Sequence, residues 1–260
     1  MGEEVIVVKR AHRGPVAALA AAGIAMVVVC GCGGSPAVTG DAVPRVNEHV
    51  PADLDITFRW LPGPVLDLFG PEGTFVRAYV ESFELADAGR STTWGYHGFV
   101  AASPSNIDSM IAAYPPDVSA DRPGVGTAIF TGLRRLDDGD WTRIVLCRHG
   151  FRSVRDGPGN GSSWTSRTDA PRPVEIDFRR VGAGPPKVKS GTKRTPDGEV
   201  FGDWHTTRVD FAAIYPTPTA DQNACAAMVS SGVPQRAPAH GGQPWPSLTP
   251  SPGWSATSLL

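Results

Sequence analysis

The sequence predicts an α+β domain in which two N-terminal helices pack on a curved antiparallel sheet of about four strands. Between residues 71 and 114 apolar residues recur at helical spacing, and after Gly126 the pattern changes to alternation. The chain has 260 residues, of which 41% are hydrophobic and 19% charged, which is enough for one ordinary domain with tails.

The first predicted helix has about 16 residues and lies within residues 71–89. Pro71 and Glu72 suit a first helical turn, and Gly89 suits the position just after a helix end. One apolar face is formed by residues at helical spacing, namely Phe75, Val76, Tyr79, Val80 and Phe83.

The second predicted helix is shorter and follows an aromatic-rich connection that contains Trp94, Tyr96, His97 and Phe99. Ser105 and Asp108 have the spacing of a capping box, and Pro115-Pro116 ends the helix. Its apolar face consists of Ile107, Met110, Ile111 and Tyr114.

Four strands are expected after Gly126. Residues 127–136 and 141–154 form a hairpin around the Asp-Gly turn at 137–140. Residues 174–179 alternate between apolar and charged types, and residues 204–212 supply the fourth strand, with Val209 and Phe211 facing inward. The segments 156–172 and 182–200 are rich in Gly, Pro and Ser and are expected to be loops.

This order of elements resembles the NTF2-like, or cystatin-like, architecture, a cone whose open end often holds a pocket. On that resemblance, a pocket lined by Tyr79, Trp94 and Trp141 with a shifted His or carboxylate would favour a cyclase or isomerase. A filled cone with only surface charges would favour a binding or structural role.

The N-terminus has the pattern of a secretory signal. A basic patch at Lys9, Arg10, His12 and Arg13 precedes an uncharged apolar run from Pro15 to Val29. This run is shorter than the roughly 20 residues that a membrane-spanning helix needs. An uncleaved anchor helix and plain secretion remain as alternatives.

Residues Val29-Cys30-Gly31-Cys32 resemble the bacterial lipobox. The resemblance implies that Cys32 is lipidated, with fatty acids such as palmitate, and becomes the new N-terminus. We therefore expect a lipid-anchored protein on the extracytoplasmic face of the cell membrane, with a signal peptide at 1–31. A flexible tether at 32–55, a single α+β domain at 56–230 and a disordered Pro-rich tail at 231–260 would follow.

Two cysteines, Cys147 and Cys225, remain for the mature domain. In an exported protein such a pair most often forms a disulfide. Two unrelated buried thiols are the alternative. A metal site is disfavoured because no His lies within four residues of Cys225.

No catalytic constellation stands out, and we expect no catalytic residues, no metal and no cofactor. His97, His149 and His205 could converge with Glu84, Asp140 or Asp203, but no metal-ligand spacing connects them, so surface or hydrogen-bonded histidines are favoured. Arginines at strand ends could form an anion-binding rim, although solvated strand-edge charges are the favoured interpretation; these are Arg134, Arg135, Arg152, Arg155, Arg179 and Arg180.

Two further classes of site are disfavoured. Gly157–Ser163 lacks the lysine and the following helix of a phosphate loop, and no serine lies in a GxSxG motif. The net charge of −2 and the absence of a basic stripe argue against a nucleic-acid partner.

The stretch FGPEGTFVRAYVESF at residues 69–83, followed by GYHGF at residues 95–99, resembles a run found in uncharacterised actinobacterial, mycobacterial-type lipoproteins. The resemblance implies localisation and fold but no activity. We therefore expect a non-catalytic domain that binds an envelope protein or an apolar ligand. An NTF2-like pocket enzyme and an accessory subunit of an envelope transport or secretion system are the alternatives.

Overall fold

The computed structural model describes residues 54–113, 124–156, 163–187, 190–210, 219–228 and 232–255. The predicted signal segment, Cys32, almost all of the tether, the end of the second helix and most of the Gly157–Ser163 loop lie outside these ranges. None of the helices in the described ranges is long and apolar enough to cross a membrane.

The described elements are mainly strands. In chain order they are β1 (Asp55–Leu61), α1 (Pro71–Gly89), the 3-10 helix η1 (Thr92–Trp94), α2 (Ile107–Ala112), β2 (Gly124–Asp138), β3 (Trp141–Arg155), β4 (Trp164–Arg179), β5 (Ser190–Gly191), β6 (His205–Asp210), α3 (Ala220–Ala227), β7 (Ala239–Gly241) and β8 (Gly253–Trp254).

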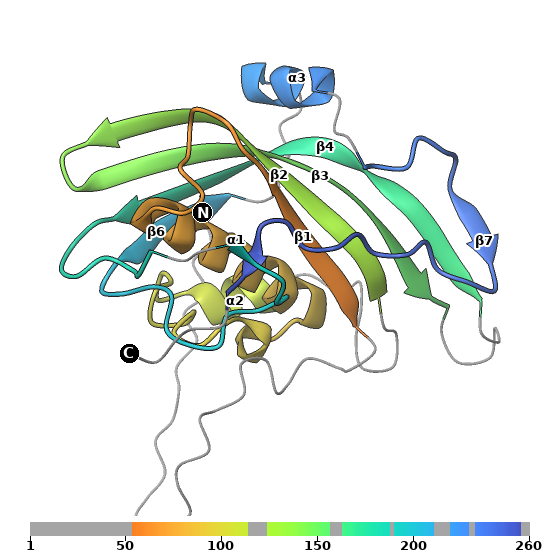
Figure 1. Ribbon diagram of the computed structural model, residues 1–260, viewed down its shortest axis with the longest axis horizontal. Helices are drawn as coiled ribbons and strands as arrows, with labels where there is room; N and C mark the ends of the chain where they lie inside the picture. The colour runs from red at the N-terminus through yellow and green to blue at the C-terminus, as the bar shows by residue number, and fades with distance from the viewer. Residues whose placement is uncertain are drawn as a thin grey trace, which may run out of the picture. The chain divides into compact units, whose positions relative to one another are not determined.

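The main sheet has six strands in the order β1-β2-β3-β4-β6, and β7 pairs with the other end of β4 (Figure 1). It is a mixed sheet because β1 runs parallel to β2, whereas the other neighbours are antiparallel. The prediction of two N-terminal helices packed on a four-stranded antiparallel sheet, and with it the NTF2-like architecture, is therefore wrong.

The strand that overturns this prediction lies at the boundary where a tether was expected. Ile56, Phe58 and Trp60 alternate with Thr57 and Arg59, which is the pattern of a strand. Parallel pairing requires a long crossover, and the segment that contains α1 and α2 supplies it. The helices thus lie within a connection between two paired strands and do not precede the sheet.

Helix α1 is present where the sequence predicts it, but it has 19 residues and includes Gly89. Its expected apolar face is buried, and Phe75 contacts the Phe178 ring of β4 with centroids 5.0 Å apart. The helix ends differently from the prediction, since Arg90 and not a glycine takes the left-handed conformation, with φ 54°. Gly89 is needed for close packing instead, because a Cβ there would lie 2.2 Å from the Trp94 ring.

Helix α2 lacks the predicted capping box. It begins after Asn106, which makes no side-chain cap, and Asp108 instead accepts a hydrogen bond from Thr92 Oγ1 at 2.7 Å. The apolar positions Ile107 and Ile111 are buried as expected.

The hairpin predicted around residues 137–140 is present as β2 and β3, with Gly139 at φ 61° in its turn. Strand β4 is much longer than expected, because residues 164–172 continue the pairing with β3 where a loop was predicted. The β3–β4 pairing shifts register between Arg148 and Gly150, which places a bulge beside His149.

The sheet has two buried faces, which we call the α1 face and the α3 face (Figure 1). Side chains alternate along β3, so Ile144, Leu146 and Arg148 lie on the α1 face, and Cys147 and His149 lie on the α3 face. The main hydrophobic core fills the α1 face. A second set of buried residues lies on the other side and includes Ile129, Val145, Phe151 and Trp245.

The expected disordered tail is ordered over residues 232–255. We call residues 245–255 the C-terminal strap. On the α3 face, the Leu248 amide donates to Thr127 Oγ1 at 2.8 Å. Along the β1 edge, Ser251 exchanges backbone hydrogen bonds with Phe58 and Trp60, and beyond it β8 pairs with β5. The strap is too short to form a hydrophobic core of its own. It is ordered because it packs along the β1 edge and against side chains on both faces of the sheet.

Candidate functional site

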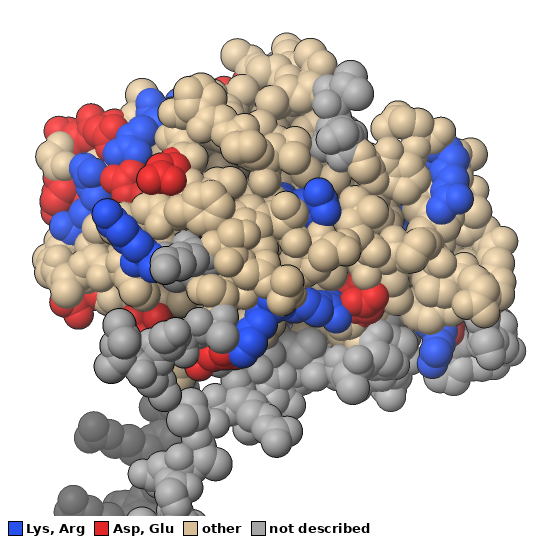
Figure 2. Space-filling model, in the orientation of Figure 1, with Lys and Arg blue, Asp and Glu red and all other residues tan. Residues whose placement is uncertain are grey.

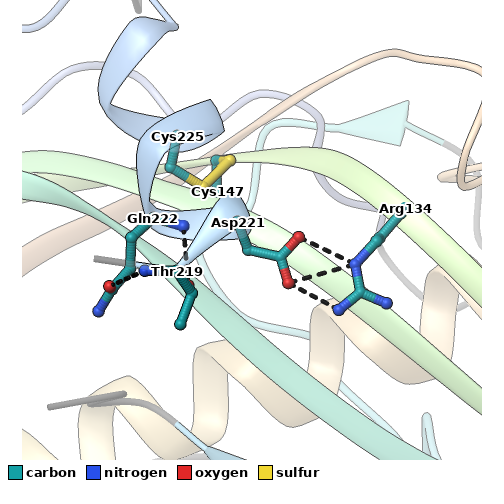
Figure 3. Close-up of a disulfide and its surroundings, with 6 residues drawn as sticks. All are labelled: Arg134, Cys147, Thr219, Asp221, Gln222 and Cys225. Carbon is teal, nitrogen blue, oxygen red and sulfur yellow. Dashed lines mark hydrogen bonds and ion pairs between the residues drawn. A yellow bond between two sulfur atoms is a disulfide. The ribbon is translucent and has the colours of Figure 1, made fainter. Parts of the chain in front are cut away.

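The predicted disulfide between Cys147 and Cys225 is present, with an S–S distance of 2.00 Å. It fixes α3 to β3 (Figure 3). Thr219 and Gln222 form a capping box at the start of α3, and Asp221 accepts hydrogen bonds from Arg134, the shortest of 2.6 Å. Since Cys225 is the buried residue of this short helix, the disulfide is its main attachment to the sheet.

A pocket of 450 Å³ lies beside this disulfide on the α3 face, a volume typical of small-molecule sites. Its walls come from β3 and β4, the end of α3 and the segment before β7. The lining residues are His149, Thr168, Asp169, Pro171, Ala226, Met228, Val233, Pro234, Gln235, Arg236 and Ala237.

His149 is the buried polar group of this pocket. Its side chain is 4% exposed, and its Nε2 atom has no hydrogen-bond partner in the described structure. Burial, and then the neighbouring charge of Arg148, lower the pKa of His149. The imidazole is therefore neutral at pH 7 and can donate or accept one hydrogen bond.

Two charged residues also line the pocket, and their surroundings differ. Asp169 accepts a hydrogen bond from Arg148 Nη1 at 2.8 Å and lies 3.6 Å from Arg152 Nε. Arg236 is exposed, and its guanidinium lies 4.0 Å from the centroid of the Trp245 ring. Within the described residues no carboxylate forms an ion pair with Arg236, so the rim of the pocket has a positive charge available.

Behind the pocket, on the α1 face, Arg148 forms a buried charge cluster with Glu84 and Asp169. Its Nε and Nη2 donate to the two oxygens of Glu84 at 2.5 and 2.9 Å. Burial alone would raise the pKa of Asp169, but the charges of Arg148, Arg152 and Arg172 together hold it at about 2. Arg148 thus has its hydrogen-bonding groups occupied by two carboxylates, which gives it a structural role.

A second buried cluster holds the C-terminal strap on α1. The fully buried Glu81 accepts hydrogen bonds from Trp60 Nε1 and Trp254 Nε1, both at 2.7 Å, and from the Tyr96 hydroxyl at 2.5 Å. One turn earlier, Arg77 lies 4.3 Å from the Trp254 ring centroid and donates to the Pro252 carbonyl at 2.9 Å. The oxygens of Glu81 are thus occupied by donors of the protein itself, whereas Nε of Arg77 has no hydrogen-bond partner in the described structure. Glu81 and Arg77 are both buried.

The three predicted histidines do not come together. His97 is exposed after η1, His149 lies in the pocket, and His205 is the first residue of β6. Their expected partners are engaged elsewhere: Glu84 by Arg148, Asp140 by Arg179, and Asp203 by the Ala183 amide. The described residues contain no group of three His, Cys, Asp or Glu side chains placed to hold a metal.

Most of the arginines at strand ends are paired with carboxylates of the protein and do not make a shared anion-binding rim. Arg134 pairs with Asp221, Arg179 with Asp140, and both Arg135 and Arg180 with Glu72. Arg152 lies at the opposite end of β3 beside Asp169. Figure 2 shows the resulting mixture of positive and negative side chains at the end of the sheet that carries the β2–β3 turn, whereas the surface over α3 is almost uncharged.

The three aromatic residues that would have lined an enzyme pocket lie in different surroundings. Tyr79 is fully buried and packs against Phe75 and Phe99. Trp94 packs against Gly89, and Trp141 lies beside Arg143. The His149 pocket is lined by none of the three.

Sequence reasoning named His149 but missed the residues that surround it. Residues 233–237 were assigned to a disordered tail, and 168–171 to a loop. The one available signal was the position of His149 two residues after a disulfide cysteine, on the same face of a strand. Comparisons with known protein families, with curated proteins and with solved structures found no match for this chain.

Proposed function

We propose that the protein is an exported lipoprotein, anchored through Cys32 to the extracytoplasmic face of the cell membrane, whose domain binds a ligand and is not a catalyst. The observation that carries this proposal is the Cys147–Cys225 disulfide. Disulfides of this kind persist in oxidising compartments, which supports export. Lipidation of Cys32 at the lipobox-like sequence would leave this pair together in the mature domain.

The chemistry of the described residues supports binding over catalysis. The buried carboxylate Glu81 has its oxygens occupied by Trp60, Tyr96 and Trp254, and Glu84 has both of its oxygens occupied by Arg148. Asp169 lines the pocket, but Arg148 and its neighbours hold its pKa at about 2, which makes it a weak general base at pH 7. His149 lines the pocket, but its Nε2 atom is buried, and no acidic side chain of the described residues forms a hydrogen bond with it.

Anchoring is tested by intact-mass spectrometry of the protein from the membrane fraction of an actinobacterial host. We expect a mature chain that begins at Cys32, carries a diacylglycerol and an acyl chain, and is two daltons lighter than its dithiol form. The variant Cys32→Ala should lose the lipid mass and leave the detergent phase on phase separation.

The matched control is Cys30→Ala, which changes the neighbouring cysteine and should leave both the mass addition and the membrane retention intact. An unmodified chain in the soluble fraction, or lipid that persists in Cys32→Ala, would contradict the proposed anchor.

A further inference from the structure

We propose that one end of the sheet docks the domain onto the anionic lipid headgroups of the membrane that carries its anchor. We call this surface the arginine end; it consists of Arg148, Arg152, Arg167 and Arg172 on the paired strands β3 and β4. The inference rests on the proposed function as an anchored protein and adds the orientation in which the domain lies on the membrane. An excess of positive charge and its place beside the tether carry it.

Like charges face one another across β3 and β4. Arg148 lies opposite Arg172, and Arg152 lies opposite Arg167. Residues directly opposite in an antiparallel pair share a face, and like charges in such positions destabilise the sheet. Arg148, Arg152 and Arg172 line one small cavity together with Glu84 of α1, which places them on the α1 face. Four guanidinium groups are thus gathered on one face at this end of the sheet.

Two carboxylates compensate these charges in part. Glu84 accepts hydrogen bonds from Arg148 and lies 4.0 Å from Arg172. Asp169 accepts a hydrogen bond from Arg148 and lies 3.6 Å from Arg152. Because four arginines meet two acids, the cluster keeps an excess of positive charge.

The uncompensated charge is at the surface. Arg167 is exposed and forms no hydrogen bond or ion pair with any residue that the structure describes. The Arg172 side chain is 42% exposed, and the carboxylate it approaches, that of Glu84, is already held by shorter bonds from Arg148. The acids nearby are offset by other basic groups, namely Asp87 by Arg90, Asp55 by Arg194 and Asp156 by the adjacent Arg155.

The tether joins the domain at the same end of the sheet. Ile56, the second residue of β1, lies in one cross-strand row with Arg152 of β3 and Arg167 of β4. Adjacent strands are about 4.8 Å apart, so Arg167 lies about 15 Å from the start of β1. The expected tether between Cys32 and this point reaches about 25 Å, which allows the row to contact the membrane that holds the anchor.

The opposite end of the sheet lacks such an excess. It carries the β2–β3 turn (Figure 1), where Arg135 pairs with Asp137 and Arg179 pairs with Asp140. Strand β3 has 15 residues, so the two ends are about 45 Å apart. An anionic surface would therefore attract one end and turn the other away from the membrane.

The attraction is weak without the tether. A basic residue close to an anionic lipid surface favours binding about fivefold, which is equivalent to roughly 1 kcal/mol. Two such charges do not hold a free chain on the surface at about 0.15 M salt, whereas a tether keeps the domain at a high effective concentration beside it. We therefore expect docking in the anchored chain and not in a chain without an anchor.

The test supplies the anchor chemically, so that it does not depend on lipidation in a cell. The mature oxidised chain has one free thiol, that of Cys32, which is coupled to a maleimide-headgroup lipid. Vesicles of phosphatidylcholine, with or without phosphatidylglycerol, carry the coupled chain. Phenylglyoxal modifies accessible guanidinium groups, and peptide mass spectrometry measures its rate of reaction at each arginine.

We expect Arg167 and Arg172 to react at least about fivefold more slowly on the anionic vesicles than on the neutral ones. Arg179, at the other end of β4, should react at the same rate on both. Salt at about 0.5 M should remove the difference, because it screens the attraction.

A substitution separates docking from other causes of protection. In Arg167→Gln, the protection of Arg172 on the anionic vesicles should fall about fivefold, because one of the two uncompensated charges is gone. The Arg167 side chain is exposed, so this variant should keep the fold, and circular dichroism checks that it does. The matched control Arg179→Gln removes an exposed arginine at the other end of β4 and should leave the protection of Arg172 unchanged.

Equal reaction of Arg167 and Arg172 on both vesicles would overturn the inference. Equal protection of Arg179 would overturn it as well, because it would indicate crowding without orientation. If inorganic phosphate protected the two arginines as strongly in the absence of vesicles, the surface would be a site for small anions and not for a membrane.

The outcome is distinguishable from that of the proposed anchor. A chain that is lipidated in the cell but whose arginines react equally on both vesicles contradicts the docking alone. A chain that docks when coupled but is not lipidated in the cell contradicts the anchor alone.

Discussion

Glu81 accepts three side-chain hydrogen bonds in a fully buried position, next to the equally buried Arg77. Burial raises the pKa of Glu81, and Arg77 with the three donors opposes that rise. In Glu81→Gln, the amide nitrogen cannot accept from the Tyr96 or Trp254 donors, and Arg77 loses its compensating charge. We expect the free energy of unfolding to fall by about 3 kcal/mol.

Urea unfolding at pH 7 measures this change. Asp140→Asn is the control, because it removes a carboxylate from an exposed ion pair with Arg179 and should cost less than about 1 kcal/mol. If both variants lost the same free energy of unfolding, the buried position of Glu81 would not make its contribution to stability larger than that of an exposed acid.

Arg148 determines how stability depends on pH in the neighbouring cluster. The pKa of Asp169 is about 2 in the folded state, below its ordinary value of 3.8. A group with a depressed folded pKa contributes stability above its unfolded pKa, and this contribution is lost as the pH falls from about 4 to 2. In Arg148→Met, Asp169 and Glu84 would stay buried without their guanidinium, so their pKa values would rise and their ionisation would oppose folding.

We therefore expect Arg148→Met to be less stable than the wild type by about 3 kcal/mol at pH 7, with the difference shrinking as the pH falls to 3. Urea unfolding at pH 3, 5 and 7 checks this, with the exposed Arg179→Met as the control that should show a small difference at every pH. If the difference in stability between Arg148→Met and the wild type were the same at pH 3 and pH 7, Arg148 would not be the group that stabilises the ionised carboxylates of Asp169 and Glu84.

At the scale of elements, local sequence patterns correctly predicted the helices and turns that depend mainly on interactions between residues close in the chain. Helix α1 and the β2–β3 hairpin follow directly from helical spacing and from the Asp-Gly turn. The predicted capping box between Ser105 and Asp108 is absent, because the Asp108 carboxylate accepts a hydrogen bond from Thr92, sixteen residues before it in the chain. Elements that depend on distant partners, such as α3 and the strands of residues 239–241 and 253–254, were missed entirely.

Helix α3 shows what a single covalent attachment does for a short element. Eight residues are too few for a stable isolated helix, and Cys225 is its buried residue. Replacing both cysteines, as Cys147→Ala with Cys225→Ala, should lower the free energy of unfolding by about 4 kcal/mol, because the disulfide closes a long loop. The α3 amides should then exchange hydrogen faster, while those of α1 exchange at a rate set by global unfolding.

Hydrogen-exchange mass spectrometry of the double variant measures both effects. Asp221→Asn serves as the control, since it breaks only the ion pair with Arg134 and should change the α3 protection by less than about 1 kcal/mol. Protection of α3 that survives loss of the disulfide would mean that packing, and not the covalent bond, holds the helix.

For the whole molecule, the topology could not be predicted from the sequence, because it depends on pairing between segments that are far apart in the chain. The parallel partnership of β1 with β2 links residues about 70 positions apart, and no local pattern specifies it. The same limit explains the error over residues 232–255. Their composition predicts disorder, yet Trp254 reaches Glu81 across 173 positions and is 1% exposed. The candidate pocket could not be predicted for the same reason, since its walls come from four separate segments of the chain.

The charge distribution of the whole molecule leads to a last prediction, on polyanions. The net charge is −2, and at the β2–β3 end of the sheet the arginines alternate with acids: Asp137 lies beside Arg135, and Asp140 beside Arg179. Binding to nucleic acid scales with the phosphates that unpaired basic groups can neutralise. We expect the protein to pass through a double-stranded DNA column without retention at about 0.15 M salt.

If these two acids are the reason, the double variant Asp137→Asn with Asp140→Asn should be retained at low salt and elute as salt rises. This double variant removes the Asp137 partner of Arg135 and the Asp140 partner of Arg179. A control variant, Asp197→Asn, removes one exposed acid beside Lys193 and raises the net charge by one unit without taking a partner from an arginine. If the DNA column retained the wild type as strongly as the double variant, this explanation would be contradicted, because Asp137 and Asp140 would then not reduce the attraction between the arginines and DNA.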